Sequence, residues 1–258
     1  MFRIFSSFDS DSESATITAS SALANYPVSR LANPVVADVW KTTGASASEA
    51  IYVDLGAEMS IDAFALLGHD FTASDSGFLF EADATYPIPT EPTISISLSY
   101  HAQDFIVFFE PEDDDVRYCQ FTFTKATASA IRSAGRLLIG THYQCPRSPL
   151  LRTPQWGMEA QGLQVQRTQH GQQYTDGAWI PRTFRATFPA CPQAMLDELT
   201  ALARDQGLWS PFLISQNWDE QPYAMSLYGR LAQAPQATHH RAEGDDVFDI
   251  TLDMVEVN

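Results

Sequence analysis

The first 145 residues contain a succession of short β-strand patterns and no amphipathic helical pattern. Residues 51–55 alternate in polarity, residues 93–100 place large apolar side chains on one face and serines on the other, and residues 105–109 are apolar throughout. A period of two is typical of a strand with one buried face, and a short apolar run fits a strand buried on both faces. Repeated short strands joined by loops predict a mostly β structure that begins with a β-sandwich or jelly roll.

Residues 51–71 carry the clearest part of this pattern. We expect two consecutive strands here, the first broken at Gly56 and the second covering residues 61–67. Gly68, His69 and Asp70 follow, and these small and polar residues should form the turn at which the second strand ends. We interpret the segment as the central strand pair of the sandwich.

A proline-rich stretch at residues 145–154, CPRSPLLRTP, interrupts the strand pattern. Because proline cannot donate to a ladder, no central strand runs through it. We therefore predict a jelly-roll domain over residues 1–148 and a smaller α+β domain over residues 149–258. In the second domain, residues 192–206 have the apolar stripe of a helix, followed by Gly207 at the position of a C-terminal cap. We expect this helix to pack on an antiparallel sheet.

The charge balance excludes several classes of partner. The chain has 32 acidic and 15 basic residues and a net charge of -17. Binding to nucleic acid or to anionic membranes requires clustered basic residues, so we expect neither partner. No apolar run approaches the roughly 20 residues of a membrane helix, and residues 1–14 lack a signal-peptide pattern. Three widely spaced cysteines, Cys119, Cys145 and Cys191, indicate reduced thiols in a protein made in the cytoplasm.

No set of residues predicts catalysis, a cofactor or a metal site, so we do not expect an enzyme. His69 and Asp70 are adjacent and should point to opposite faces, and the chain has no nucleophile elbow and no phosphate-binding loop. The pair His239 and His240 with Glu243 does not supply a converging zinc set. Acidic clusters at residues 9–13 and 112–115 have calcium-type ligands without the EF-hand pattern, which leaves calcium binding open.

Four segments resemble the galactose-binding-like, discoidin-type jelly roll. They are SRLANPVVADVW (29–40), YVDLGAEMSIDAFALLGHDF (52–71), RYCQFTFT (117–124) and GRLLIG (135–140). Together with a compact β-rich second domain that ends in an alternating acidic strand, they resemble tail-tip or baseplate proteins, of the distal tail type, from long-tailed bacteriophages and gene-transfer particles. The resemblance implies a structural subunit of the virion tail tip, made in the host cytoplasm. It also implies a homo-oligomer, in the form of a ring, that assembles with tail tube or hub proteins.

The aromatic residues supply the candidate binding positions for two alternative functions. An assembly interface would use tryptophans near loops of the second domain, and the sequence does not sort core from interface among them. These candidates are Trp156, Trp179, Trp209 and Trp218. The alternative function is a carbohydrate-binding module that contacts host surface glycans. A sugar site needs an exposed aromatic platform beside polar groups, for which Trp40 and Tyr86 are the candidates in the first domain.

Overall fold

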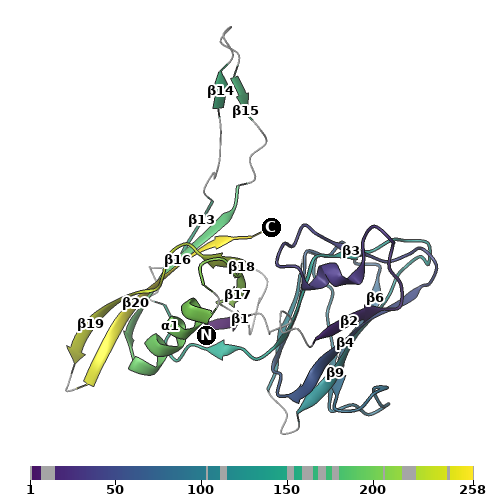
Figure 1. The fold of residues 1–258 in the computed structure, drawn as a ribbon, viewed down its shortest axis with the longest axis horizontal. Helices are drawn as coiled ribbons and strands as arrows, with labels where there is room; N and C mark the ends of the chain where they lie inside the picture. Colours follow the sequence, from purple (N-terminus) through teal and green to yellow (C-terminus); the bar gives the residue numbers. More distant parts are fainter. Residues whose placement is uncertain are drawn as a thin grey trace. The chain divides into compact units, whose positions relative to one another are not determined.

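The fold is mostly β, as predicted. The computed structural model describes residues 2–6, 15–102, 104–110, 115–149, 154–158, 165–167, 173–175, 180–205, 207–216, 225–242 and 245–257. Within these residues it contains several antiparallel strand pairings and one α-helix (Figure 1). None of the described helices has the length and apolar character that a membrane span requires.

The chain divides into two compact units. The sandwich unit comprises Arg3–Tyr143 and Ser215–Ser226, and the helix unit comprises Met1–Phe2, Gln144–Ile214 and Leu227–Asn258. Independent folding of residues 1–148 and 149–258 stays a prediction.

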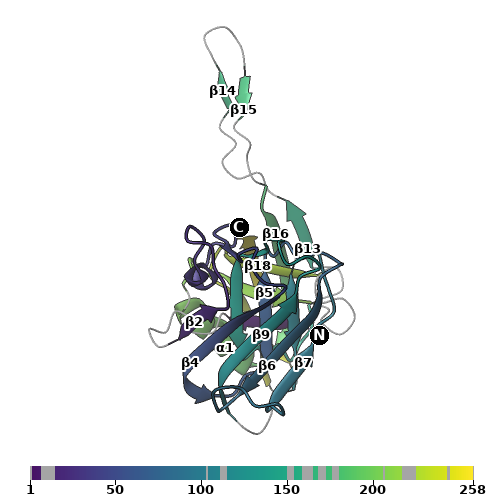
Figure 2. The same cartoon turned by 90° about the vertical axis from the view of Figure 1, so that its right-hand side faces the viewer.

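Two sheets form the sandwich unit. A five-stranded sheet has the order β2 (Thr16–Ala19), β4 (Ser48–Met59), β9 (Val116–Thr124), β6 (Ser76–Asp83) and β7 (Ile94–Ser97), which Figure 2 shows side by side. A three-stranded sheet has the order β11 (Arg136–Gly140), β5 (Ala63–Leu67) and β8 (Phe105–Phe108). A short pair of β3 (Trp40–Lys41) with β10 (Ser133–Ala134) and the 3-10 helix η1 (Val28–Ala32) complete the unit.

The core of this unit lies between the two sheets. The ring centroid of Phe64, on β5, lies 4.4 Å from that of Phe80 on β6 and 5.5 Å from that of Phe121 on β9. On β4, Ile51 and Val53 are buried in the same cluster. Because successive side chains of a strand alternate, their neighbours on β4 and β9 lie on the outer face of the five-stranded sheet.

The structure corrects the interpretation of residues 51–71 as one strand pair. β4 pairs with β2 and β9, whereas β5 pairs with β11 and β8 in the other sheet. β4 also continues through Gly56, where φ is 81° and the register with β9 shifts, to Met59. A glycine adopts this positive φ without strain, so it bends the strand instead of ending it. The predicted turn at Gly68 is present, with φ of 63°.

The helix unit contributes to the largest sheet, which has eight strands. Its order is β12 (Tyr143–Gln144), β1 (Arg3–Ser6), β17 (Phe212–Ser215), β18 (Ser226–Leu231), β20 (Asp245–Glu256), β16 (Arg182–Cys191) and β13 (Gln155–Met158), with β19 (Gln236–Ala242) paired to β20. A separate antiparallel pair is formed by β14 (Val165–Arg167) and β15 (Gln173–Thr175).

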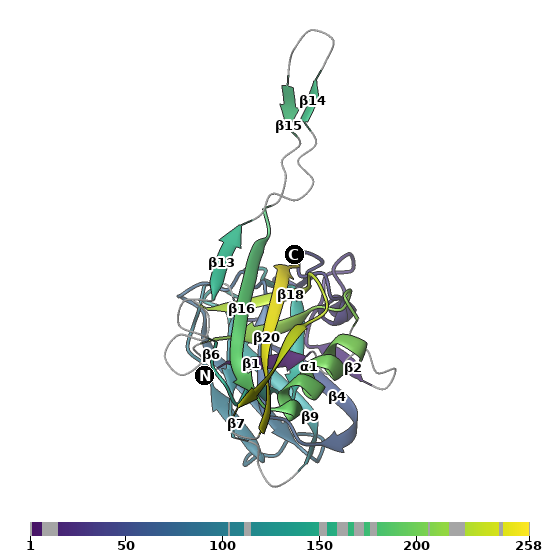
Figure 3. The same ribbon diagram turned by 90° about the vertical axis from the view of Figure 1, so that its left-hand side faces the viewer.

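The predicted helix is α1 (Gln193–Asp205), which contacts β20 (Figure 3). Its residues Met195 and Leu199 are 0% and 1% exposed. Gly207 follows with φ of 65°, the left-handed conformation that commonly ends a helix. The sequence pattern therefore predicted both the helix and its buried side.

Candidate functional site

An open hollow of about 360 Å³ lies on the outer face of the five-stranded sheet. Its walls come from β2, β4, β9 and the loop between β6 and β7, all within the sandwich unit. The residues that line it are Thr16, Thr18, Tyr52, Val53, Asp54, Tyr86, Ile88, Tyr118 and Cys119. Three of them are tyrosines, and one carries a charge.

Strand alternation places the polar residues of this hollow. Ile51 and Val53 point into the core, so Tyr52 and Asp54 point outwards from β4. Asp54 is the register partner of Tyr118 on β9, which brings that tyrosine to the same face. The alternation that points apolar side chains into the core therefore also points aromatic and acidic side chains to the outer face.

Tyr86 is the exposed aromatic residue of the hollow. Its side chain is 65% exposed, and its ring centroid lies 5.5 Å from that of Tyr118. Tyr86 lies in the loop that follows β6, and Asp83 at the end of β6 joins the two ends of this loop. Asp83 Oδ1 accepts hydrogen bonds from the backbone N and Oγ1 of Thr85, at 2.8 and 2.7 Å, and Oδ2 accepts one from the backbone N of Thr93 at 3.1 Å.

These hydrogen bonds act on the ionisation of Asp83. Burial raises the pKa of Asp83, but the bonds from Thr85 and Thr93 outweigh burial and hold the pKa below its usual value. The ionised carboxylate is therefore the form that anchors the loop.

Asp54, which lines the hollow, forms an ion pair with Arg117 through two hydrogen bonds. Arg117 Nε donates to Asp54 Oδ1 at 2.8 Å, and Arg117 Nη2 donates to Asp54 Oδ2 at 3.1 Å. The hydrogen bond from Arg117 lowers the pKa of Asp54, so this carboxylate is ionised at neutral pH. The guanidinium carbon of Arg117 also lies 5.0 Å from the centroid of the Tyr118 ring.

Of the two predicted glycan platforms, one lies at the surface and the other is buried. Tyr86 lines the hollow, but Trp40 is fully buried and its Nε1 donates to the backbone oxygen of Ser21 at 3.1 Å. The prediction for Trp40 is therefore corrected: its ring belongs to the core between the sheets and offers no surface to a ligand. Proximity to loops in the sequence did not distinguish the two residues.

The four interface candidates lie in the second half of the chain. Trp209 is 81% exposed, with the guanidinium carbon of Arg230 at 5.7 Å from its ring centroid. Trp156 is partly buried and lies 4.9 Å from the ring centroid of Phe184. Trp179 and Trp218 lie outside the described residues, as do residues 9–13, residues 112–114 and Glu243 of the acidic and histidine clusters.

His69 lies in the core and not at the surface of its turn. Its side chain is 6% exposed, and its ring centroid lies 4.6 Å from that of Phe105 and 4.8 Å from that of Phe71. Burial, and to a smaller extent the charge of His101, lowers the pKa of His69 to about 4. Asp70 instead accepts a hydrogen bond from the backbone N of Ser133. In the described part of the chain, no group of His, Cys, Asp and Glu could hold a metal ion.

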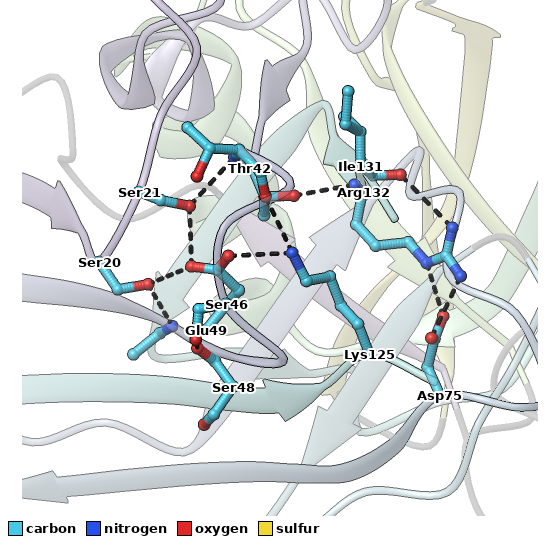
Figure 4. Close-up of polar contacts among 12 residues, drawn as sticks. Ser20, Ser21, Thr42, Ser46, Ser48, Glu49, Asp75, Lys125, Ile131 and Arg132 are labelled. Carbon is cyan, nitrogen blue, oxygen red and sulfur yellow. Dashed lines mark hydrogen bonds and ion pairs between the residues drawn. The ribbon is translucent and has the colours of Figure 1, made fainter. Parts of the chain in front are cut away.

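A buried polar network joins several loops of the sandwich unit (Figure 4), and sequence reasoning missed it. Lys125 Nζ donates to Glu49 Oε1 at 3.1 Å and to the backbone oxygen of Thr43 at 2.9 Å. Glu49 Oε2 accepts hydrogen bonds from the hydroxyls of Ser20 and Ser21, at 2.6 and 2.8 Å. Each charge has partners within the network, so we assign it a structural role.

Asp75 and Arg132 form a second ion pair in the same region, with Arg132 Nε 2.7 Å from Asp75 Oδ2. Burial raises the pKa of Asp75, but the hydrogen bonds from Arg132 and from the backbone N of Thr72 and Ala126 outweigh burial and lower it to about 2. Asp75 therefore remains ionised across the physiological range. Arg132 lies 57 positions from Asp75 in the sequence, so no local pattern could reveal this pair.

Comparison with known proteins gives likeness to solved structures only. No protein-family model matches the chain, and no curated protein matches it. A chitosan-binding module from the chitosanase/glucanase of Paenibacillus sp. IK-5 is 18% identical and has a TM-score of 0.40, with 49% of this chain and 94% of that one covered. The family 32 carbohydrate-binding module from C. perfringens NanJ, in complex with galactose, is 14% identical with a TM-score of 0.40, covering 55% of this chain and all of its own (100%).

A third similar structure is a Clostridium perfringens module solved with GalNAc-beta-1,3-galactose. It is 11% identical with a TM-score of 0.40, and the match covers 49% of this chain and 95% of that one. Similarity at this level concerns the arrangement of strands in about half of the chain. What the hollow can bind follows from its own residues.

Proposed function

We propose that the sandwich unit is a carbohydrate-binding module whose ligand occupies the hollow on the outer face of the five-stranded sheet. The observation that supports this function is the exposed ring of Tyr86 beside Tyr118 and the Asp54–Arg117 pair, around a hollow of about 360 Å³. Small-molecule sites combine such an aromatic surface with a few fixed polar groups.

The chemistry of a sugar ring suits these groups. One face of the ring carries C–H groups that stack on an aromatic side chain, and the rim carries hydroxyls that donate and accept hydrogen bonds. Tyr86 supplies the stacking surface. The carboxylate of Asp54 has about four acceptor positions. Arg117 and the backbone N of Gly56 occupy three of them, so one is left for a sugar hydroxyl. Thr16 and Thr18 add hydroxyls on the β2 side.

The test is a glycan array followed by titration calorimetry with the glycans that bind. Tyr86→Ala should weaken binding at least about tenfold, since it removes the stacking surface, while thermal melting stays unchanged. Tyr100→Ala is the matched control, because Tyr100 is 36% exposed and does not line the hollow. Equal affinity of wild type and Tyr86→Ala, or the absence of glycan binding, would contradict the proposal.

A second candidate function is assembly, and the exposed apolar residues of the helix unit favour it. Water contacts a large part of four apolar side chains there. They are Met158 at 76%, Ile180 at 48%, Leu208 at 39% and Trp209 at 81% exposed. Exposed large apolar and aromatic side chains are typical of protein interfaces.

We propose that these residues dock the protein into a homo-oligomeric ring with other tail proteins, as a tail-tip subunit of a virion that contacts host surface glycans through the sandwich unit. Light scattering after size exclusion, and assembly of the particle, test this function. Trp209→Ala should reduce assembly while monomer melting stays unchanged, and Tyr86→Ala should leave assembly intact. A Trp209→Ala protein that assembles normally would count against the tail-tip role.

A further inference from the structure

The charges around the hollow determine which class of glycan it can accept. This inference rests on the proposed carbohydrate-binding function. Among the described residues that line the hollow, one side chain is charged, the carboxylate of Asp54. Arg117 is the cation that pairs with it. Its Nε and Nη2 donate hydrogen bonds to the two oxygens of Asp54, at 2.8 and 3.1 Å. The positive charge next to the hollow is therefore already neutralised.

A second carboxylate acts on the same guanidinium. The hydrogen bond and charge of Asp54, and the charge of Glu58, all raise the pKa of Arg117. The charges of two carboxylates thus act on one cation at this end of β4, and the whole chain carries a net charge of -17. An anionic ligand would meet repulsion from Asp54 and from the general field of the protein, without a free cation among the described lining residues to offset it.

The hydrogen-bonding side of the site is better matched to uncharged hydroxyls. The remaining acceptor position of Asp54 requires a donor, which a sugar hydroxyl provides and a ligand carboxylate does not. The tyrosine rings supply stacking that does not depend on ligand charge. A neutral sugar can therefore satisfy the site completely, whereas an acidic sugar would leave its own carboxylate without a partner.

We propose that the hollow selects neutral glycans and rejects glycans that carry a carboxylate or sulfate at the bound ring, and that Asp54 is the residue that sets this selectivity. The discrimination arises because Asp54 both repels the anion and occupies the arginine that would otherwise bind it. An arginine that is not already paired is a typical partner for a ligand carboxylate, so Arg117 would bind the anion if Asp54 did not occupy it.

The experiment compares matched glycans that differ only in one charged group. Methyl glucoside is paired with methyl glucuronide, and lactose with lactose that carries one sulfate, by titration against the full chain at low and high salt. The wild-type protein should bind the neutral member at least about tenfold more tightly at low salt, and the ratio should shrink at high salt because ions screen exposed charges. In Asp54→Asn the ratio should fall toward one or invert, since Arg117 becomes free.

Asp70→Asn is the control, since it removes one carboxylate that does not line the hollow and should leave the ratio unchanged. The selectivity would be overturned if an acidic glycan bound as tightly as its neutral match and Tyr86→Ala abolished that binding. The carbohydrate-binding function would still hold in that case. A ratio that stays the same in Asp54→Asn would also overturn it. Absence of Tyr86-dependent binding to every glycan would instead overturn the carbohydrate-binding function itself.

Discussion

The ammonium of Lys125 and the carboxylate of Glu49 form an ion pair in the interior of the sandwich unit, with side chains 0% and 1% exposed. The two residues are 76 positions apart in the sequence. Further hydrogen bonds to Thr43, Ser20 and Ser21 satisfy both groups (Figure 4). The pair therefore ties the segments around residues 20, 43 and 125 to the start of β4.

Breaking this pair should destabilise the sandwich unit strongly. In Lys125→Ala, the carboxyl group of Glu49 stays buried without its cation partner, which costs about 3–5 kcal/mol of unfolding free energy. Urea denaturation measures the change. Lys41 is the other lysine of the chain and provides the control, because its Nζ lies 4.2 Å from the centroid of the Tyr26 ring and it is only partly buried. Lys41→Ala should cost about 1 kcal/mol or less. An equal loss of unfolding free energy in the two variants would show that the buried pair does not stabilise the unit more than the partly buried Lys41 does.

The buried ring of His69 should make stability depend on pH. Its pKa is about 4 in the folded chain and 6.5 ordinarily, so the unfolded chain binds the proton first. Stability is therefore complete above pH 6.5 and declines as the pH falls towards 4, by up to about 3 kcal/mol. Urea denaturation at several pH values measures the slope. The carboxylates also titrate near the lower end, so the comparison is with His69→Leu, in which the decline between pH 6.5 and 5 should become shallower. An unchanged slope would argue against a neutral, buried His69.

Asp83 should act on ligand binding without touching the ligand. Asp83→Ala removes the anchor of the loop that carries Tyr86, so we expect weaker glycan binding, by several-fold, and a loss of about 1–3 kcal/mol from the unpaired backbone donors. Asp83→Asn keeps one acceptor oxygen and should lie between wild type and Asp83→Ala. Titration calorimetry measures the change in glycan affinity, and thermal melting measures the change in stability. Full affinity in Asp83→Ala would mean that the loop keeps Tyr86 in place by other contacts.

Truncation of the buried leucine of α1 tests the packing of the helix unit. Leu199 is 1% exposed, and the helix contacts β20. Leu199→Ala should therefore cost about 2–5 kcal/mol in unfolding free energy, the range for removal of a buried leucine side chain. Leu208→Ala is the control, because Leu208 is 39% exposed. A cost below about 0.5 kcal/mol for Leu199→Ala would mean that the stripe does not support the fold.

Limited proteolysis tests the predicted domain boundary. The proline-rich stretch at residues 145–154 should be cut first, because its backbone cannot form a continuous ladder. Mass spectrometry identifies the first fragments. Initial cleavage within residues 51–71 would rule out an independent first domain.

The local pattern of the sequence was sufficient for the class of fold and for many of its elements. Alternation in β4 and β7 and the continuous apolar run of β8 predicted strands, and the apolar stripe predicted α1. These predictions succeeded because strand and helix periods follow from backbone geometry, and the buried face of each element can be read from its own residues.

The tertiary structure decided which elements meet and which side chains reach the surface. Periodicity shows that β4 and β5 are strands, but only the pairing with β9 and with β8 places them in different sheets. Trp40 and Tyr86 both lie near loops in the sequence, yet one is 0% and the other 65% exposed. The contact of Asp54 with Arg117 joins residues 63 positions apart. Such contacts depend on strand register and on packing between distant segments, and the spacing of residues along a single chain carries neither.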